Sequence, residues 1–313
     1  MEPKDIKNTL VVGAGVMGHS IAQVFAQAGI ETRLVDMDDG SLARAVNLMK
    51  SNLYTLAEYG RISGDEIPAI LERVHLSTDL ASSAGGVDFA IEVVPEIPDI
   101  KKEVFSQLNE CCPPETVIAS NTSGLDIFSL ADVRRPERVV IAHWFTPAHI
   151  IPLVEVVPGP KTSKDVVDLT AKLMERLGKE PVIMNEFVPA FIVNQIQNAI
   201  GIAVLQMLEQ GCASPEEIDR AVKLSLGIRL PVVGVVQNLD FNGLDNVRDI
   251  LNRLGVKNPL IDEKVGQGHF GAKTSRGIYD YKGRTEEEIL KKRDMRYLQM
   301  ADHLKKIRAF EPI

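Results

Sequence analysis

Two side chains on neighbouring predicted strands have the chemistry of an acid–base pair. His143 ends the apolar run RVVIAH, and the carboxyl ends of strands in open α/β sheets border the ligand crevice. Glu155 lies in the next run, LVEVV, between apolar neighbours where an unpaired carboxylate is costly. A hydrogen bond between the two would satisfy the carboxylate, fix the imidazole tautomer and stabilise the imidazolium. The pair can then take a proton from a hydroxyl group, although a core histidine beside an unrelated buried acid gives the same pattern.

Three glycines near the N-terminus have the spacing of a phosphate-binding turn. Gly13, Gly15 and Gly18 form G-x-G-x-x-G between an apolar run and a helical pattern. The first glycine permits a tight turn, the second lets the backbone approach a pyrophosphate, and the third allows close packing of the helix. Asp36 ends the next strand, where a carboxylate binds the adenosine ribose and repels a 2′-phosphate. The motif therefore predicts NAD rather than NADP, against the alternative of a glycine turn with a surface aspartate.

The elements that must position these groups alternate between strands and helices. Residues 9–36 have the pattern of a strand, a helix and a second strand, which makes one βαβ unit. A long helical arm is expected over residues 41–75. Further strands are expected at residues 87–94, 116–123, 138–145 and 153–157, with a helix at residues 99–112. This alternation predicts an α/β fold, namely a doubly wound Rossmann domain.

The pattern changes near Val188 and Pro189, and the second domain is predicted to be all-helical. We expect an NAD-binding domain over residues 1–188 and a helical domain for substrate binding and dimerisation over residues 189–313. Residues 189–211 form one long apolar helical pattern, and Ser214 with Pro215 has the residue types that open another helix. Helices this apolar need partners, so we expect a homodimer.

Composition narrows the possible partners. The chain has 313 residues, of which 45% are hydrophobic and 25% charged, as in ordinary soluble proteins. A net charge of −8 without a basic run argues against nucleic acid. No apolar stretch approaches the roughly 20 residues of a membrane helix, and MEPKDIKNTL lacks the apolar core of a secretory signal. The three cysteines have no CxxC spacing, so we expect free thiols, no metal site and a cytoplasmic protein.

Ordered segments along nearly the whole chain resemble the motifs of the 3-hydroxyacyl-CoA dehydrogenase family. The segments are VVGAGVMGHSIAQVFAQAG, SNTSGLDI, RPERVVIAHWFTPAHIIPLVEVVPGPKTS, PAFIVNQI and GAKTSRGIYDY. The resemblance implies that NAD-dependent hydride transfer oxidises an L-3-hydroxyacyl-CoA to the 3-keto product, in fatty acid metabolism. It also implies that His143 is the general acid and base and that Glu155 orients it.

The same resemblance assigns roles to four other polar residues. Ser123 and Asn194 are implied to hydrogen-bond the reacting oxygen or nearby groups, and Glu96 and Lys101 to contact the cofactor. From the residues alone, Ser123 fits a turn and Lys101 a solvated helix charge. Asn194 differs, because a polar side chain within the apolar run AFIVNQI needs a local partner.

Three departures from the family pattern predict a divergent substrate pocket. Trp144 and Thr146 stand in HWFTP, where the family commonly has HFFNP, and residues 285–310 continue as a charged C-terminal helix. The predicted arm carries four basic and four acidic residues, which leaves no net attraction for the polyanionic CoA. We therefore expect measurable but poor activity with short 3-hydroxyacyl-CoA esters.

Two other functions share this sequence pattern. One is a dehydrogenase of a CoA-free hydroxy acid or hydroxymethyl aromatic compound, which keeps the reaction and changes the substrate. The other is a crystallin-like protein that binds NAD without catalysis, against which the retained polar residues argue. Hydroxyacid dehydrogenases of the 6-phosphogluconate type use a catalytic lysine on the interdomain helix, and residues 190–211 contain none.

Overall fold

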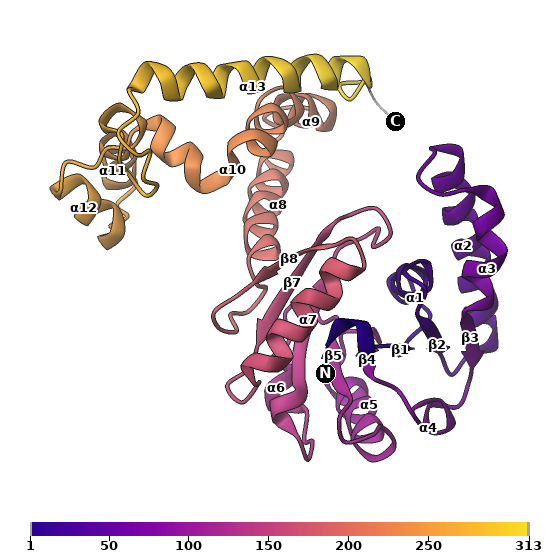
Figure 1. Cartoon of the computed structure of the whole chain (residues 1–313). Helices are drawn as coiled ribbons and strands as arrows, with labels where there is room; N and C mark the ends of the chain where they lie inside the picture. Colours follow the sequence, from indigo (N-terminus) through magenta and orange to yellow (C-terminus); the bar gives the residue numbers. More distant parts are fainter. Residues whose placement is uncertain (1, 312–313) are drawn as a thin grey trace. The chain divides into compact units, whose positions relative to one another are not determined.

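An eight-stranded sheet forms the centre of the first of two units (Figure 1). The computed structural model describes residues 2–311; the first unit ends at Ala199 and the second begins at Ile200. The strand order is β3-β2-β1-β4-β5-β6-β7-β8, and neighbouring strands are parallel except for antiparallel β6 and β7. The strands are β1 (Asn8–Val12), β2 (Glu31–Val35), β3 (Val74–Ser77), β4 (Phe89–Glu92), β5 (Val117–Ser120), β6 (Val139–Trp144), β7 (Leu153–Pro158) and β8 (Glu180–Ile183).

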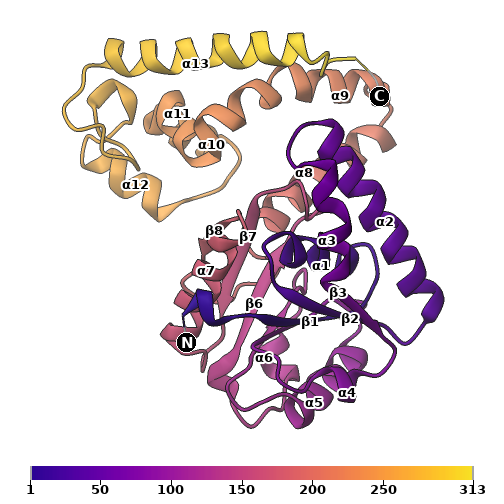
Figure 2. The same ribbon diagram turned by 45° about the vertical axis from the view of Figure 1, so that its right-hand side comes forward.

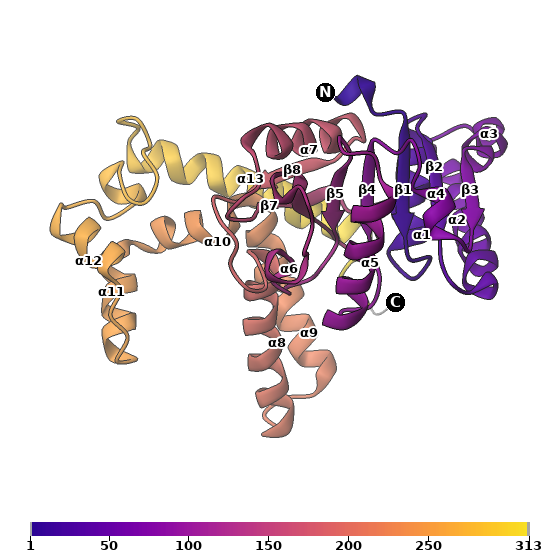
Figure 3. The ribbon, with the colours of Figure 1, turned by 90° about the horizontal axis from the view of Figure 1, so that it is seen from below.

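Helices of the first unit flank this sheet, and their positions can be followed in Figure 3. Phe25, Leu42 and Leu173 bring three helices into one buried apolar cluster, whereas Phe105 and Ile127 bring two others into a second cluster. The doubly wound α/β fold is thereby confirmed. The helices are α1 (Gly18–Gln27), α2 (Asp39–Glu58), α3 (Ile67–Glu72), α4 (Leu80–Ser83), α5 (Pro98–Cys111), α6 (Ile127–Leu130) and α7 (Lys164–Arg176).

Strand β6 contributes alternate residues to the two clusters, as the pleat of a strand requires. One cluster contains Val140, Ala142 and Trp144, and the other contains Val139 and Ile141. His143 therefore shares its face of the sheet with the second set. This alternation separates the histidine from the tryptophan that follows it in the chain.

The predicted βαβ unit over residues 9–36 is confirmed by β1, α1 and β2. The prediction of an unbroken helical arm over residues 41–75 is wrong. The arm breaks after α2 at Gly60, whose φ of 78° does not continue a helix, and Ser63 then caps a short 3₁₀ turn. After α3 the chain enters β3, a short strand with two exposed residues and no apolar run to signal it.

The second unit is helical (Figure 2). Helix α10 packs against both α9 and α13, and Gly234, with a φ of 69°, breaks its helical conformation. Buried Asp240 accepts hydrogen bonds from the Ile278 and Tyr279 amides, which ties the following loop to α10. The helices are α9 (Pro215–Leu224), α10 (Leu226–Asn242), α11 (Leu244–Arg253), α12 (Pro259–Gly266) and α13 (Glu286–Lys306). A helical second domain is thereby confirmed.

One helix, α8 (Val193–Glu209), continues across the division between the two units. It starts later than the predicted helix of residues 189–211, because Ala190 and Phe191 have positive φ angles of 62° and 51°. Ser214 caps α9 as expected, accepting from the Glu217 amide. The domain boundary at residues 188 and 189 stays a prediction.

Among residues 2–311, no single helix combines the length and apolar character needed to cross a membrane. The bent pair α9 and α10, which meet at 57°, satisfies those two criteria only when taken together.

Candidate active site

A cavity of about 1160 Å³ in the first unit lies at the carboxyl ends of β1, β2 and β4. The strand order reverses here, since β2 and β3 extend to one side of β1 and β4 to β8 to the other. Such switch points are where open α/β sheets bind ligands. The structure brings five of the predicted site residues to this cavity: Gly13, Gly15, Asp36, Glu96 and Ser123.

The glycine turn has the shape that a bound pyrophosphate requires. Gly13 has a φ of 110°, and a side chain there would come within 2.9 Å of the Val93 carbonyl oxygen. A Cβ at Gly18 would collide with the Gly13 carbonyl oxygen, whereas a Cβ at Gly15 would meet nothing within 4 Å. Two glycines thus close the turn, and the third leaves its backbone open to the cavity. The fit to a dinucleotide cofactor is good.

Asp36 lies just beyond β2 and lines the same cavity. Its Oδ2 accepts a hydrogen bond of 2.8 Å from the Ala14 amide, and its Oδ1 accepts one of 3.1 Å from the Asp38 amide. These bonds fix the carboxylate beside the glycine turn. A negative charge held there has the position that distinguishes a ribose hydroxyl from a 2′-phosphate.

His143 and Glu155 face each other across the antiparallel pair β6 and β7. The His143 Nδ1 lies 2.8 Å from Glu155 Oε2, and both side chains are buried. Glu155 Oε1 accepts from the amides of Ile192 and Val193, at 3.1 and 3.0 Å. The carboxylate therefore uses one oxygen for the imidazole and the other for the start of α8. An ionised Glu155 requires the proton on Nδ1 and leaves Nε2 as a base.

Two aromatic rings border the imidazole. The ring centroids of Phe145 and Phe191 lie 4.5 and 5.1 Å from that of His143. Apolar walls of this kind limit the access of water to a proton-transferring group and strengthen its bond to the carboxylate.

Ser123 and Asn194 lie together, but their contact runs through the backbone. The Asn194 Nδ2 donates a 3.0 Å hydrogen bond to the Ser123 carbonyl oxygen. This answers the expectation that Asn194 needs a local partner. The serine itself is exposed and lines the large cavity.

Buried Lys101 links the exposed Glu96 to a buried residue that the sequence analysis missed, Glu92. Lys101 Nζ lies 2.9 Å from each Glu92 oxygen and 3.2 Å from Glu96 Oε2, and its side chain is only 1% exposed. Glu96 in turn accepts hydrogen bonds from the Thr122 hydroxyl and the Ser123 amide. Burial alone would raise the pKa of Glu96, but the Thr122 hydroxyl and the Lys101 charge outweigh it and lower the pKa.

A sequence signal for Glu92 exists. It ends a strand in which every residue is buried, so its carboxylate must have a partner. The helical residue that supplies this partner, Lys101, follows nine positions later.

The expectation that Trp144 reshapes the substrate pocket is wrong. Its side chain is 2% exposed and packs in the apolar cluster on the other face of the sheet, with its ring centroid 6.2 Å from that of Phe25. Thr146 does lie near the cavity at the glycine turn, because its hydroxyl donates to the sulfur of Met17, which lines that cavity.

A glycine cradle and a histidine–carboxylate pair at the carboxyl edge of a doubly wound sheet define a nucleotide-dependent oxidoreductase. The model of the 3-hydroxyacyl-CoA dehydrogenase NAD-binding domain matches residues 8–187, and that of the C-terminal domain of 3-hydroxyacyl-CoA dehydrogenase matches residues 191–281. The chain belongs to the 3-hydroxyacyl-CoA dehydrogenase family. It is an NAD-dependent oxidoreductase acting on CH–OH groups, which confirms the predicted family and cofactor.

Relatives of known name span nearly the same length. The chain is 35% identical over 290 residues to a probable 3-hydroxybutyryl-CoA dehydrogenase of Bacillus subtilis, covering 90% of this chain and 99% of the relative. It is 31% identical to 5-formyl-3-hydroxy-2-methylpyridine 4-carboxylate 5-dehydrogenase of Mesorhizobium japonicum, covering 88% and 91%. A 3-hydroxyacyl-CoA dehydrogenase structure from Archaeoglobus fulgidus matches with a TM-score of 0.77, 26% identity and coverage of 96% and 99%. This membership favours an enzyme over a non-catalytic NAD-binding protein.

Proposed function

We propose that the enzyme oxidises the hydroxyl group of an L-3-hydroxyacyl-CoA, or of a related 3-hydroxy acid, to the 3-keto product. The proposal rests on the buried 2.8 Å contact between His143 and Glu155, which gives the imidazole a fixed tautomer and a free Nε2. Relatives named 3-hydroxybutyryl-CoA dehydrogenase and hydroxyacyl-coenzyme A dehydrogenase support this substrate class. With an acyl-CoA substrate the enzyme acts in fatty acid metabolism.

His143 acts as the general base in this proposal. Its Nε2 takes the hydroxyl proton, and the Glu155 carboxylate, held by two backbone amides, stabilises the imidazolium that forms. Bound NAD supplies the hydride acceptor. In the reverse direction the imidazolium returns the proton to the carbonyl oxygen.

The cofactor is proposed to lie along the glycine turn. Gly13, Gly15 and Gly18 let the backbone approach its pyrophosphate, and Asp36 binds the adenosine ribose. Glu96 lines the same cavity and is proposed to contact the cofactor. Lys101 is buried beneath it, so its part is to position Glu96 through their ion pair of 3.2 Å.

Ser123 and Asn194 are proposed to act near the reacting oxygen. The Ser123 hydroxyl lies on the exposed surface of the cavity, where it can donate to a substrate oxygen. Asn194 holds the serine in place through its hydrogen bond to the Ser123 carbonyl.

Substitution of Glu155 tests the central pair. Glu155→Gln retains an oxygen for the two amides but removes the charge that stabilises the imidazolium, so kcat should fall about tenfold to 10³-fold. KM and the affinity for NAD should stay within about twofold. If Glu155→Gln lowered kcat only because it unfolds the site, the affinity for NAD would fall as well. An unchanged kcat would contradict the proposal.

A CoA-free substrate is the second candidate. It is favoured by the similarity to the pyridine carboxylate dehydrogenase, whose solved structure matches with a TM-score of 0.72 at 28% identity over 96% of this chain and 99% of that chain. The decisive experiment compares NAD reduction with 3-hydroxyacyl-CoA esters, free 3-hydroxy acids and hydroxymethyl pyridines. Inactivity with every CoA ester would replace the leading proposal with this one.

We also propose a cytoplasmic homodimer. The support for a dimer is the apolar surface of the second unit, where Ile202, Leu205 and Leu254 are 59%, 66% and 70% exposed. The support for the location is that Cys111, Cys112 and Cys212 are all free thiols. Light scattering that finds a monomer at micromolar concentration would contradict the dimer.

A further inference from the structure

A second cavity, of about 140 Å³, lies within the second unit between α10, α13 and the loop that joins Tyr281 to Arg284. Its space is many times the roughly 10–15 Å³ that one water needs on the same measure. Four cationic side chains line it: Arg284, Lys292, Arg293 and Arg296. All four follow residue 281, where the match to the family's C-terminal domain ends. The cavity therefore depends on the C-terminal extension of this chain.

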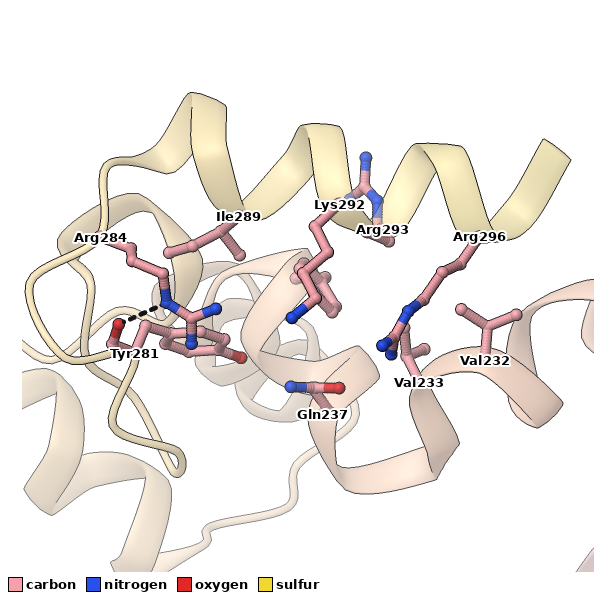
Figure 4. Close-up of a pocket in the computed structure, with 10 residues that line it drawn as sticks. Val232, Val233, Gln237, Tyr281, Arg284, Ile289, Lys292, Arg293 and Arg296 are labelled. Atoms are coloured by element: carbon pink, nitrogen blue, oxygen red, sulfur yellow. Dashed lines mark hydrogen bonds between the residues drawn. The ribbon is translucent and has the colours of Figure 1, made fainter. Parts of the chain in front are cut away.

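Three of the four cations converge. Figure 4 shows Lys292 and Arg296 reaching from α13 toward Gln237 on α10, with the Arg284 guanidinium approaching from the Tyr281 side. Arg293 points away from Gln237 in the same view. Its guanidinium lies over the rings of Phe241 and Tyr297 and pairs with Asp294 at 2.8 Å.

The three convergent cations have no carboxylate within 4.0 Å among residues 2–311. The Arg284 side chain donates a hydrogen bond of 2.8 Å from its Nε to the Tyr281 carbonyl, which fixes the guanidinium without neutralising it. Like charges that share a small cavity repel one another. The arrangement therefore favours a bound anion, although the whole chain carries a net charge of −8.

Nearby carboxylates are already engaged elsewhere. Asp240 is 1% exposed and accepts from two backbone amides and the Tyr281 hydroxyl. Glu288 accepts from the Thr285 amide in the capping box of α13. Neither side chain pairs with Arg284, Lys292 or Arg296, whose exposed side chains are therefore available to solvent or to an external anion.

We propose that this cavity binds the phosphate group of a small molecule, with Arg284, Lys292 and Arg296 as its cationic ligands and the Gln237 amide as a further donor. A phosphate monoester carries about −1.5 to −2 charges at neutral pH and offers three strong acceptor oxygens. It matches three converging cations better than a single carboxylate does. Two guanidinium groups supply the paired donors that phosphate oxygens accept.

The volume identifies how much of the ligand enters. At about 140 Å³, against about 1160 Å³ for the cavity at the glycine turn, the site holds a phosphate group rather than a whole dinucleotide. The phosphate can come from a free anion or from the 3′-phosphate of CoA. The two sources share the same recognition chemistry, and binding measurements separate them.

Isothermal titration calorimetry with inorganic pyrophosphate tests the site. The full-length protein is first saturated with NAD, so that pyrophosphate does not bind at the glycine turn. We expect pyrophosphate to bind the wild-type protein, and the double variant Lys292→Gln with Arg296→Gln to bind it at least about tenfold more weakly. NAD affinity should be equal in both proteins, which shows that the first unit of the variant is folded, and equal circular dichroism spectra show that its helical second unit is folded too.

The matched control is Lys305→Gln with Lys306→Gln, which removes the same charge from the same helix outside the cavity. Its affinity for pyrophosphate should stay within about twofold of the wild-type value. Equal weakening in both double variants would mean diffuse surface charge and would overturn the proposal. So would the absence of binding to the wild-type protein.

A comparison of CoA with dephospho-CoA then identifies the source. If the wild-type protein binds CoA more tightly than dephospho-CoA, and the double variant Lys292→Gln with Arg296→Gln loses this difference, the site binds the 3′-phosphate of CoA. Equal binding of the two compounds, with pyrophosphate still bound, assigns it to a free phosphate ligand. These measurements need no turnover, so their outcome is independent of the proposed reaction.

Discussion

The two units use charged side chains in opposite ways. In the first unit, buried Glu92 and Lys101 compensate each other, and Glu155 is shared between an imidazole and two backbone amides. In the second unit, Lys292 and Arg296 approach one cavity without a carboxylate partner among the described residues. Charges that are paired inside the protein fix the positions of neighbouring groups, whereas unpaired charges at the surface are available for an external ligand.

The apolar residues show the same contrast. Two large buried clusters cover the sheet of the first unit. The second unit has only two small ones among its described residues, centred on Leu244 and Ile289. The first unit thus buries many apolar side chains in its own core, whereas the second unit leaves apolar side chains exposed on its surface.

The largest expected effect comes from breaking the proposed catalytic pair of the first unit, His143 and Glu155. His143→Gln removes the proposed base and should lower kcat by about 10²–10⁴-fold while NAD affinity is kept. The control is His75→Gln, at an exposed histidine of β3. Steady-state kinetics and NAD titration check both variants, and a near-normal kcat for His143→Gln would show that another group is the base.

Substitution of Lys101 tests whether the buried ion pair between Lys101 and Glu92 is needed for stability. Lys101→Met leaves Glu92 buried without its cation, so the free energy of unfolding should fall by about 3–5 kcal/mol. Lys102→Met, at the exposed neighbouring position, should change it by less than about 0.5 kcal/mol. Urea denaturation measures both, and equal stabilities would mean that the Glu92 carboxylate needs no such partner.

Asp36, in the cavity at the glycine turn, is the charge of the first unit that is proposed to act on a ligand. Wild-type enzyme should prefer NAD to NADP, and Asp36→Ala should narrow the ratio of their kcat/KM values by about tenfold or more. Asp39→Ala, at the exposed start of α2, removes a charge nearby and should leave the ratio unchanged. A wild-type preference for NADP would refute the role of Asp36.

Lys179 gives the smallest effect, because its charge meets carbonyl groups rather than a carboxylate. It donates to the carbonyls of Ala148 and Ile151, and burial lowers its pKa from 10.5 to about 8. Between these values the unfolded chain binds more protons than the folded one, so this group makes the free energy of unfolding rise with pH.

The comparison of wild type with Lys179→Met isolates this contribution. The stability difference should change in favour of the wild type by about 1–2 kcal/mol from pH 8 to pH 10. Lys172→Met, at an exposed position on α7, should show no such trend in urea denaturation. A difference that is flat with pH would mean that Lys179 keeps an ordinary pKa.

The sequence predicts the parts of the fold that repeat a simple pattern. Apolar runs bounded by glycines identify β1 and β2, and the residue types at Ser214 and Pro215 identify the start of α9. Strand β3 was missed because its residues are largely exposed and form no apolar run. The break in the arm has a local signal, the glycine at residue 60, that the long helical pattern obscured.

The site is predictable in its residue types and less so in its contacts. A buried acid in LVEVV indicates a partner, and the opposing strand supplies His143. The ion pair of Lys101 depends on how α5 packs on β4, which no short pattern encodes. The direction of Trp144 follows from strand alternation with His143, which the motif HWFTP taken by itself does not indicate.

The alternation of side chains between the two faces of β6 limits which sequence changes this strand can accept during evolution. Single substitutions at Val140 or Ala142 alter only local packing, whereas the insertion or deletion of one residue inverts every side chain beyond it. Such a shift would turn the imidazole into the apolar layer and present an indole to Glu155. Length variation is therefore tolerated in the loops that flank β6 and not within it, so that lineages derived from this chain should keep six residues there while their identities drift.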